Sequence, residues 1–264
     1  MYHSIIFIDP STNKEINTYD DWFLAPQSRP VIAMPDKKTY YIDIPGASGS
    51  IDMSETLTGY PIYGNRTGSL SFFVLNALNG LEVDRWNIRY DEISNFLHGR
   101  YLKMILEDEP NYFYSGRIFV SDWNSKENNS EITFDYELEP YKWSVEETTD
   151  SNWLWDPFDF ETGDTQRYTK YTNLVVNSPS TYKTYTFSKD DEGYAPVTPI
   201  FRVSSMTTTF SLRFVNTALN IDVTYPLVVG DNEFLDCIIT NTADWKFYIK
   251  GAGTLSVVYR KGRL

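Results

Sequence analysis

Cysteine and histidine are the scarcest reactive residues of this chain, which has one Cys and two His among 264 residues. A single cysteine, Cys237, excludes an intrachain disulfide framework and a cysteine-rich zinc site. It lies in the apolar run 234–239, which predicts an inert thiol buried in a strand. His3 and His98 belong to no metal-binding spacing and cannot supply three zinc ligands by themselves. We therefore expect no metal and no cofactor.

Long hydrophobic runs are also lacking. No stretch approaches the roughly 20 apolar residues that cross a bilayer. The apolar run 5–8 near the N-terminus is too short for the core of a secretory signal and follows no basic segment. Together with the lone cysteine, this predicts a protein made in a reducing cytoplasm, with no membrane insertion.

Basic residues are in the minority, 23 against 36 acidic ones, which gives a formal net charge of −13. General binding to nucleic acid backbones depends on clustered Lys and Arg, so the composition argues against specific nucleic-acid binding. The hydrophobic content of 41% and the aromatic content of 16% argue against intrinsic disorder. The chain is expected to fold.

Catalytic signatures are missing as well. The sequence contains no G-x-S-x-G, no phosphate-binding loop and no dinucleotide-binding glycine motif. A two-carboxylate glycosidase leaves no short motif, so the acidic pairs at 146–147, 156 and 159, and 190–192 are candidates to weigh. All of them lie in polar or turn-like stretches typical of solvated surface carboxylates. We expect no catalytic residue and no enzyme.

What the chain does have is β-favouring sequence with strict alternation. Apolar residues take every second place in segments 132–138, 210–214 and 102–106, the pattern of half-buried strands. Segments 118–123 and 132–138 flank a polar run and predict a hairpin with a long loop. Further strands are expected at 69–75, 182–187, 221–225, 246–249 and 255–259. The fold class is therefore mainly β.

One amphipathic helix is expected among the strands, over about residues 84–98. Its apolar residues follow the 4-3-4 spacing of one helical face: Trp86, Tyr90, Ile93 and Leu97. Gly99 is a natural residue to end the helix. The apolar stripe is either core packing, with the helix as a lid over a sheet, or a candidate interface with a partner.

A change of composition near the middle predicts a domain junction. Residues 144–164 contain seven acidic side chains and no Lys or Arg, and a run of one charge sign resists burial. The expected domains are residues 1–145 and 146–264. Aromatic residues within the run (Trp153, Trp155, Phe158 and Phe160) are expected to anchor the second domain. Turn-like sequence at 177–179 and 190–193 favours a β-sandwich there.

Short segments along the whole chain, densest in residues 20–68, follow a distinctive order. They are residues 20–22, 28–30, 41–52, 55–59, 63–68, 98–100, 112–117, 139–143, 155–161, 251–255 and 259–264. This order resembles the distal tail protein (Dit) family of long-tailed phages that infect Gram-positive hosts. The resemblance rests on the order of the segments and not on any single motif.

The resemblance implies an N-terminal β-sandwich domain with a hairpin extension and a helix, followed by a galectin-like β-sandwich. It implies a structural protein of the virion that forms a homohexameric ring at the tail tip. That ring joins the major tail tube protein to the tail-associated fibre or lysin protein, and DNA passes through its channel. In some phages the outer domains also hold receptor-binding or other baseplate proteins.

The second domain departs from the sugar site of galectins. Residues 145–264 contain no His, and Trp245 is followed by Lys246, Phe247 and Tyr248 where a galectin has a Glu three residues on. Architecture alone does not carry function. The alternative function left open is a monomeric carbohydrate-binding module or the accessory domain of a glycan hydrolase, which would also explain the abundant Trp and Tyr.

Acidity suggests a role in the implied ring. Six copies would concentrate negative charge around a channel, and an acidic wall would repel DNA and prevent its adhesion. Asp43, Asp52 and Glu55 lie in a glycine-punctuated stretch and are the candidate channel-facing residues. The alternative is that they are ordinary turn carboxylates.

Overall fold

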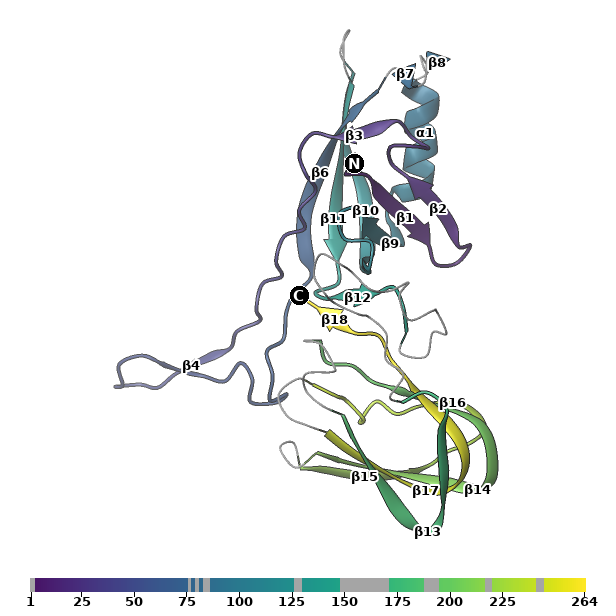
Figure 1. Ribbon diagram of the computed structural model, residues 1–264. Helices are drawn as coiled ribbons and strands as arrows, with labels where there is room; N and C mark the ends of the chain where they lie inside the picture. The colour runs from purple at the N-terminus through teal and green to yellow at the C-terminus, as the bar shows by residue number, and fades with distance from the viewer. Residues whose placement is uncertain are drawn as a thin grey trace. The chain divides into compact units, whose positions relative to one another are not determined.

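Strands make up most of the described chain, as the alternating sequence predicted (Figure 1). The computed structural model describes residues 3–75, 77–78, 81–82, 86–125, 130–147, 171–187, 195–216, 220–240 and 245–264. The chain divides into two units. The first is Met1–Lys38 with Tyr63–Lys142, and the second is Thr39–Ile62 with Trp143–Leu264. The expected division between residues 145 and 146 stays a prediction.

An antiparallel sheet forms the frame of the first unit. Its strand order is β2-β1-β9-β10-β11-β6-β3. The strands are β1 (Ile5–Asp9), β2 (Lys14–Asn17), β3 (Leu24–Pro26), β6 (Arg66–Val74), β9 (Arg100–Leu106), β10 (Tyr112–Ser125) and β11 (Ser130–Leu138). The predicted hairpin is confirmed, because β10 and β11 pair with Ile118 opposite Tyr136 and Trp123 opposite Ile132.

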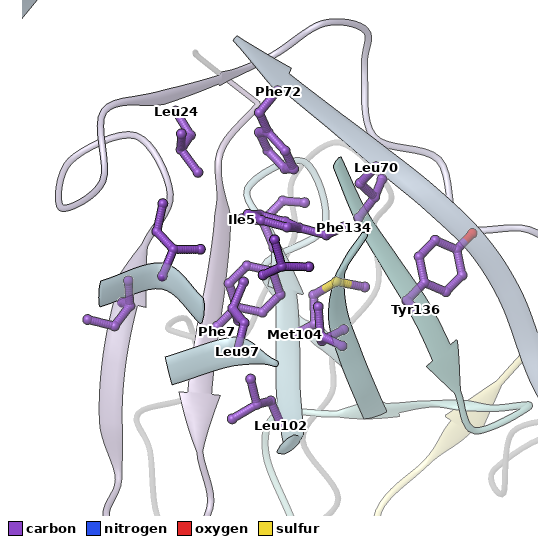
Figure 2. Close-up of a cluster of buried hydrophobic side chains, with 14 of the residues drawn as sticks. Ile5, Phe7, Leu24, Leu70, Phe72, Leu97, Leu102, Met104, Phe134 and Tyr136 are labelled. Carbon is purple, nitrogen blue, oxygen red and sulfur yellow. The ribbon is translucent and has the colours of Figure 1, made fainter. Parts of the chain in front are cut away.

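Alternation fixes which side of this sheet becomes core. In β11 every second side chain from Ile132 to Leu138 is buried, whereas Thr133, Asp135 and Glu137 face outward. Phe134 packs on Phe72 of β6, with ring centroids 5.1 Å apart. Figure 2 shows these rings among the aliphatic side chains of β1 and β9. Period-2 burial on several strands thus builds one continuous core.

The predicted helix is confirmed as α1 (Trp86–Leu97). Ile93 and Leu97 are fully buried in the core of the first unit, and Tyr90 packs edge-on against Trp123 at 5.4 Å. Gly99 follows with a φ of 74°, a conformation that glycine adopts without steric cost, so the expected helix end is confirmed.

Short elements complete the chain. They are β4 (Tyr41–Asp43), β5 (Ser50–Asp52), β7 (Ala77–Leu78), β8 (Leu81–Glu82), β12 (Lys142–Ser144) and β18 (Gly262–Arg263). β4 pairs with β5 and β7 with β8, each as a small antiparallel hairpin. Within the described ranges, no helix is both long enough and apolar enough to span a bilayer.

A second antiparallel sheet frames the second unit, in the order β13-β17-β14-β15, with β16 on β14. Its strands are β13 (Leu174–Phe187), β14 (Ile200–Asn216), β15 (Ile221–Pro226), β16 (Gly230–Glu233) and β17 (Trp245–Val258). The two ends of the long β14 pair with different neighbours, β16 at residues 200–203 and β15 at residues 211–216. Figure 1 shows β14 and β17 curving together.

Two sequence expectations about this sheet were wrong. Segments 246–249 and 255–259 do not form separate strands, since β17 runs on through Gly251-Ala252-Gly253. The strand expected at 210–214 is confirmed and belongs to the 17-residue β14. Residues 177–179 are not a turn between strands but lie in β13, beside a register shift between Ser178 and Lys183. Irregular pairing interrupts the alternation without ending a strand.

Candidate functional site

The two histidines are far apart in the fold and both make structural contacts. His3 Nδ1 lies 2.7 Å from Asp108 Oδ1, and Arg29 Nε donates to Asp108 Oδ2 at 2.7 Å. The backbone N–H of Val120 donates to His98 Nδ1 at 3.2 Å. Over the described residues, no group of three or more His, Cys, Asp or Glu side chains is placed to hold a metal ion.

Asp108 is a nearly buried carboxylate between the side chains of His3 and Arg29. Burial alone would raise its pKa, but the hydrogen bonds from His3 and Arg29 outweigh that effect and the pKa of Asp108 is lowered. Its carboxylate thereby ties the start of β1 to the segment that follows β3. This arrangement stabilises the fold and holds no proton ready for transfer at neutral pH.

Cys237 is fully buried, as predicted, but it does not lie in a strand. It follows β16 in an irregular segment, where its N–H donates to the carbonyl of Phe234 at 2.9 Å. Burial raises the pKa of the Cys237 thiol to about 12, with a smaller contribution from the Asp236 carboxylate. A thiol held protonated is a poor nucleophile.

The acidic pairs show no catalytic geometry where the structure describes them. Glu147 forms an ion pair with Arg260 at 3.0 Å. The candidates at 156, 159 and 190–192, and the aromatic residues 153, 155, 158 and 160, lie outside the described residues, as does most of the acidic run 144–164. Glu146 and Glu147 are half-buried at its start.

A cavity of about 440 Å³ opens between the β1–β2 turn and α1. Its apolar wall is formed by Ile16, Trp22 and Phe96. The charged groups at its rim already have local contacts: Arg100 lies 3.5 Å from Asp9, and the Lys14 ammonium lies 5.5 Å from the Phe96 ring centroid. These contacts do not indicate a reaction in the cavity.

The most unusual feature is a 24-residue arm, Thr39–Ile62, in which no residue is buried. β4 and β5 form its hairpin, and Figure 1 labels β4 in this long excursion of the chain. Large apolar side chains are exposed along it: Tyr40, Tyr41, Ile42, Ile44, Ile51, Leu57 and Ile62. Leu57 is 95% exposed. Such a concentration of exposed apolar side chains marks an interaction surface.

All three candidate channel residues lie on this arm, and all are exposed. Asp43 is in β4, Asp52 is in β5, and Glu55 is in the turn that follows. Tyr41 pairs with Asp52, Ile42 with Ile51, and Asp43 with Ser50. Because opposed residues share a face, Asp43 and Asp52 lie on one side of the hairpin and the two isoleucines on the other.

The root of the arm is held firmly within the first unit. Tyr136 Oη accepts from the N–H of Ala33 at 3.0 Å, and Arg66 Nη1 donates to the carbonyl of Ala33 at 2.9 Å. Arg66 Nε also donates to the carbonyl of Pro140 at 2.9 Å. On the returning chain, the N–H of Gly64 donates to the backbone carbonyl of Asp36 at 2.8 Å. These contacts fix where the exposed segment begins and ends.

Sequence reasoning did not single out Arg66, although the residue is only 1% exposed. Burial lowers its pKa, and the Tyr114 ring centroid lies 5.5 Å from the guanidinium carbon. Gly68 is the available signal, because a Cβ there would collide with the Tyr136 hydroxyl that holds Ala33. The sequence signal is thus a basic residue, Arg66, between Gly64 and Gly68 at the start of β6.

The candidate interface stripe on α1 is mostly internal. Ile93 and Leu97 pack in the core, and Tyr90 is half-buried against it, so the core-packing interpretation holds at these positions. The side chain of Trp86 lies outside the described residues. The surface that α1 presents carries other residues, among them Ile88, Asp91 and Glu92.

Comparisons with known proteins give a match among solved structures. No family model matches the chain, and no curated protein does. Among solved structures, the chain is similar to the Dit (gp 19.1) protein of SPP1, described as a paradigm of the hub adsorption apparatus in Gram-positive infecting phages. The TM-score is 0.55 at 13% identity, over 98% of this chain and 99% of that one. This chain therefore has a Dit-like, mainly β fold over nearly its whole length.

Proposed function

We propose that this chain is a non-enzymatic component of a phage tail tip, where six copies assemble into a ring. The observation that carries the proposal is the Dit-like fold over nearly the full length of both chains, since the SPP1 protein is a hub of an adsorption apparatus. The ring joins the major tail tube protein to the tail-associated fibre or lysin protein. Receptor-binding or baseplate proteins are further partners, and the location is the virion.

The exposed arm supports self-association. A closed ring needs two different patches on each subunit, because every copy meets its neighbours through unlike surfaces. The arm, Thr39–Ile62, offers one such patch, with seven large apolar side chains exposed. An isolated two-stranded hairpin is marginal in water, so contact with a neighbouring copy would also stabilise β4 and β5.

The two faces of the hairpin suit two different surroundings. Ile42 and Ile51 would pack against the neighbouring subunit, which removes their apolar surface from water. Asp43 and Asp52, on the opposite face, would then be directed away from that contact. Together with Glu55 they give the arm three acidic and no basic residues. An acidic channel wall would let DNA pass without adhesion.

The ring is tested with the pair Leu57→Ser and Leu235→Ser. Both leucines are largely exposed, at 95% and 78%, so neither change should unfold the subunit. We expect light scattering to show hexamers for the parent chain and for Leu235→Ser. Leu57→Ser should shift the equilibrium to smaller species, because it removes apolar surface from the arm contact.

Assembled particles provide the decisive observation, since some tail proteins oligomerise only on their partners. Cryo-electron microscopy of virions carrying a labelled copy of this chain should locate six labels at the tail tip. Labels elsewhere in the particle would refute the proposed role. A chain that stays monomeric, is absent from tails and binds cell-wall polysaccharide would instead be the carbohydrate-binding module named above.

A further inference from the structure

The sheet of the second unit has one side in the core and one side in solvent. Alternation buries Phe247 and Ile249 of β17 while Lys246, Tyr248 and Lys250 reach the other side. We call that other side the polar face. Its twelve residues are Tyr182, Thr184 and Thr186 of β13; Lys246, Tyr248 and Lys250 of β17; Ser211, Arg213 and Val215 of β14; and Asp222, Thr224 and Pro226 of β15.

Strand register arranges these residues in rows across the sheet. Lys250 is opposite Ser211, which is opposite Pro226. In the next row Thr184, Tyr248, Arg213 and Thr224 are successive partners. The last row runs from Thr186 through Lys246 and Val215 to Asp222. All twelve side chains are exposed or half-buried, so the rows form an accessible platform.

The charge of the polar face is opposite to that of the chain. The platform carries three basic residues and one acidic residue, whereas the chain has 23 basic and 36 acidic ones. Lys246 and Lys250 are four residues apart on one strand, or about 13 Å at ~3.3 Å per residue. Cations spaced along one strand in this way match a polymer with repeated negative charges better than a single small anion.

Tyrosine rings hold two of the three cations in place. The Lys250 ammonium lies 5.4 Å from the Tyr182 ring centroid, and the Arg213 guanidinium lies 5.7 Å from that of Tyr248. Arg213 also makes two hydrogen bonds to Asp222, at 2.8 and 2.6 Å. Head groups that are already positioned lose less conformational freedom when an anion binds.

Hydroxyl groups surround these cations. Tyr182 Oη and Ser211 Oγ lie 3.0 Å apart, and Thr184, Thr186 and Thr224 add three more hydroxyls on the same face. A hydroxyl both donates and accepts, which matches the hydroxyls of a sugar. Tyrosine adds a flat apolar ring with a polar tip. Charge alone would suit any polyanion, whereas this combination suits a saccharide.

We propose that the polar face binds an anionic polysaccharide. Its carboxylate or phosphate groups would pair with Lys246 and Lys250, its hydroxyls would meet the Thr and Ser side chains, and its rings would lie near Tyr182 and Tyr248. The residues differ from the His- and Trp-based sugar site of galectins that the sequence lacks. The proposal does not depend on ring formation.

The test measures binding of the full chain to immobilised polygalacturonate, a carboxylated polysaccharide, by biolayer interferometry. Dextran serves as a neutral polysaccharide and poly-L-glutamate as an acidic polymer without sugar. We expect binding to polygalacturonate that weakens as salt rises, and at least tenfold weaker binding to each of the other two. Lys246→Gln combined with Lys250→Gln should weaken polygalacturonate binding at least tenfold.

Matched variants separate the polar face from overall charge. Lys14→Gln combined with Lys38→Gln removes the same charge from exposed sites of the first unit and should leave binding unchanged. Tyr182→Ala should weaken binding to polygalacturonate, and thermal unfolding would verify that each variant is folded.

Four results would overturn the proposal. They are no binding to polygalacturonate, equal binding to dextran, equal binding to poly-L-glutamate (which would indicate an acidic protein partner), and equal losses in the two lysine pairs. Light scattering on the same samples reports ring formation separately.

Discussion

Arg66 shows how one buried charge can define the start of an exposed segment. Removing a guanidinium from water is costly, and the cost is offset here by hydrogen bonds to the carbonyls of Ala33 and Pro140 and by the Tyr114 ring. Backbone carbonyls are fixed points, so the side chain also fixes the position of the chain that leaves for the arm.

Cys237 should be unreactive in the folded protein. The thiolate is the nucleophile, and burial raises the thiol pKa to about 12. Relative to an ordinary pKa of about 8.5, the thiolate fraction at pH 8 falls by roughly 10³-fold. A thiol-specific reagent at pH 8 should therefore modify Cys237 at about that much lower rate than in denaturant. Rapid modification of the native chain would contradict the burial.

The same shift predicts a pH dependence of stability. Above about pH 8.5 the unfolded chain loses the thiol proton while the folded chain keeps it until about pH 12. The unfolded state then binds fewer protons, so the free energy of unfolding decreases as pH rises through this interval. Urea unfolding at pH 8 and pH 10 should show that decrease. In Cys237→Ala the free energy of unfolding should decrease less between pH 8 and pH 10. The two proteins are compared by this change with pH and not by their absolute stabilities.

At the scale of elements, β14 and β17 decide the form of the second unit. Their pairing shifts register between Val203 and Ser205, again between Met206 and Thr208, and once more before Ser211. Each shift bends the pair, so β14 reaches β16 with one end and β15 with the other. Gly251 and Gly253 of β17 lie opposite this bend, with φ values of 141° and 152°.

Gly253→Ala should destabilise the protein by at least about 2 kcal/mol. Its φ is strained for any residue with a Cβ, and the new Cβ would lie 2.9 Å from Met206 Cα. The three nearest atoms are all backbone atoms of Ser205 and Met206, which cannot move aside as a flexible side chain would. Chemical denaturation measures the effect, and Ala252→Ser, at the residue between the two glycines, is the control expected to change stability little. Equal stabilities of the two variants would show that the bend tolerates a side chain.

The buried and the exposed face of α1 differ in how well the sequence predicts them. The apolar stripe predicted from spacing is real, and two of its members pack in the core. A partner that contacts α1 would therefore meet the exposed face, where Ile88 is 52% exposed beside Asp91 and Glu92. An amphipathic pattern identifies the buried face and says little about the face that remains.

At the scale of the whole molecule, charge of both signs is distributed unevenly. The arm has three acidic and no basic residues, while the polar face of the second unit has an excess of basic ones. In a chain with a net charge of −13, this separation gives the two surfaces opposite charge, so charge complementarity acts differently on each. The acidic arm suits repulsion of DNA, and the polar face suits attraction of a polyanion.

Reversing charge on the arm should affect DNA passage if the proposed channel is correct. Assembled particles with Asp43→Lys, Asp52→Lys and Glu55→Lys together should eject DNA more slowly, because lysines on the wall would hold the phosphate backbone. The delay should diminish at high salt. Lysine at three exposed carboxylates outside the arm (Glu15, Asp20 and Asp91) is the control. Unchanged ejection in intact particles with the arm variant would place these carboxylates elsewhere.

Much of the fold could be predicted from periodicity. The alternation in 102–106, 132–138 and 210–214 correctly predicted strands and their buried sides, and the 4-3-4 spacing correctly predicted α1. The pairing of strands distant in sequence could not be predicted. For this reason segments 246–249 and 255–259 were predicted as two strands, although both belong to β17. The resemblance to Dit proteins, based on the order of segments, predicted the fold that the comparison confirms.

The candidate site was predicted less completely. Asp43, Asp52 and Glu55 could be placed in one glycine-punctuated stretch, but their exposure and the opposite isoleucine face follow from the β4–β5 register. Arg66 was missed because the glycines on either side of it, Gly64 and Gly68, do not by themselves distinguish a buried arginine from a surface one. The polar face was missed because its twelve residues come from four strands.

The sequence by itself determined the mainly β class, the helix and the net acidity, because composition and local periodicity depend only on the residues present and their near neighbours. The tertiary structure alone decided which strands are continuous, which cations share a surface and which apolar residues of the arm stay exposed. These depend on contacts between distant segments, and such contacts are set by packing of the whole chain.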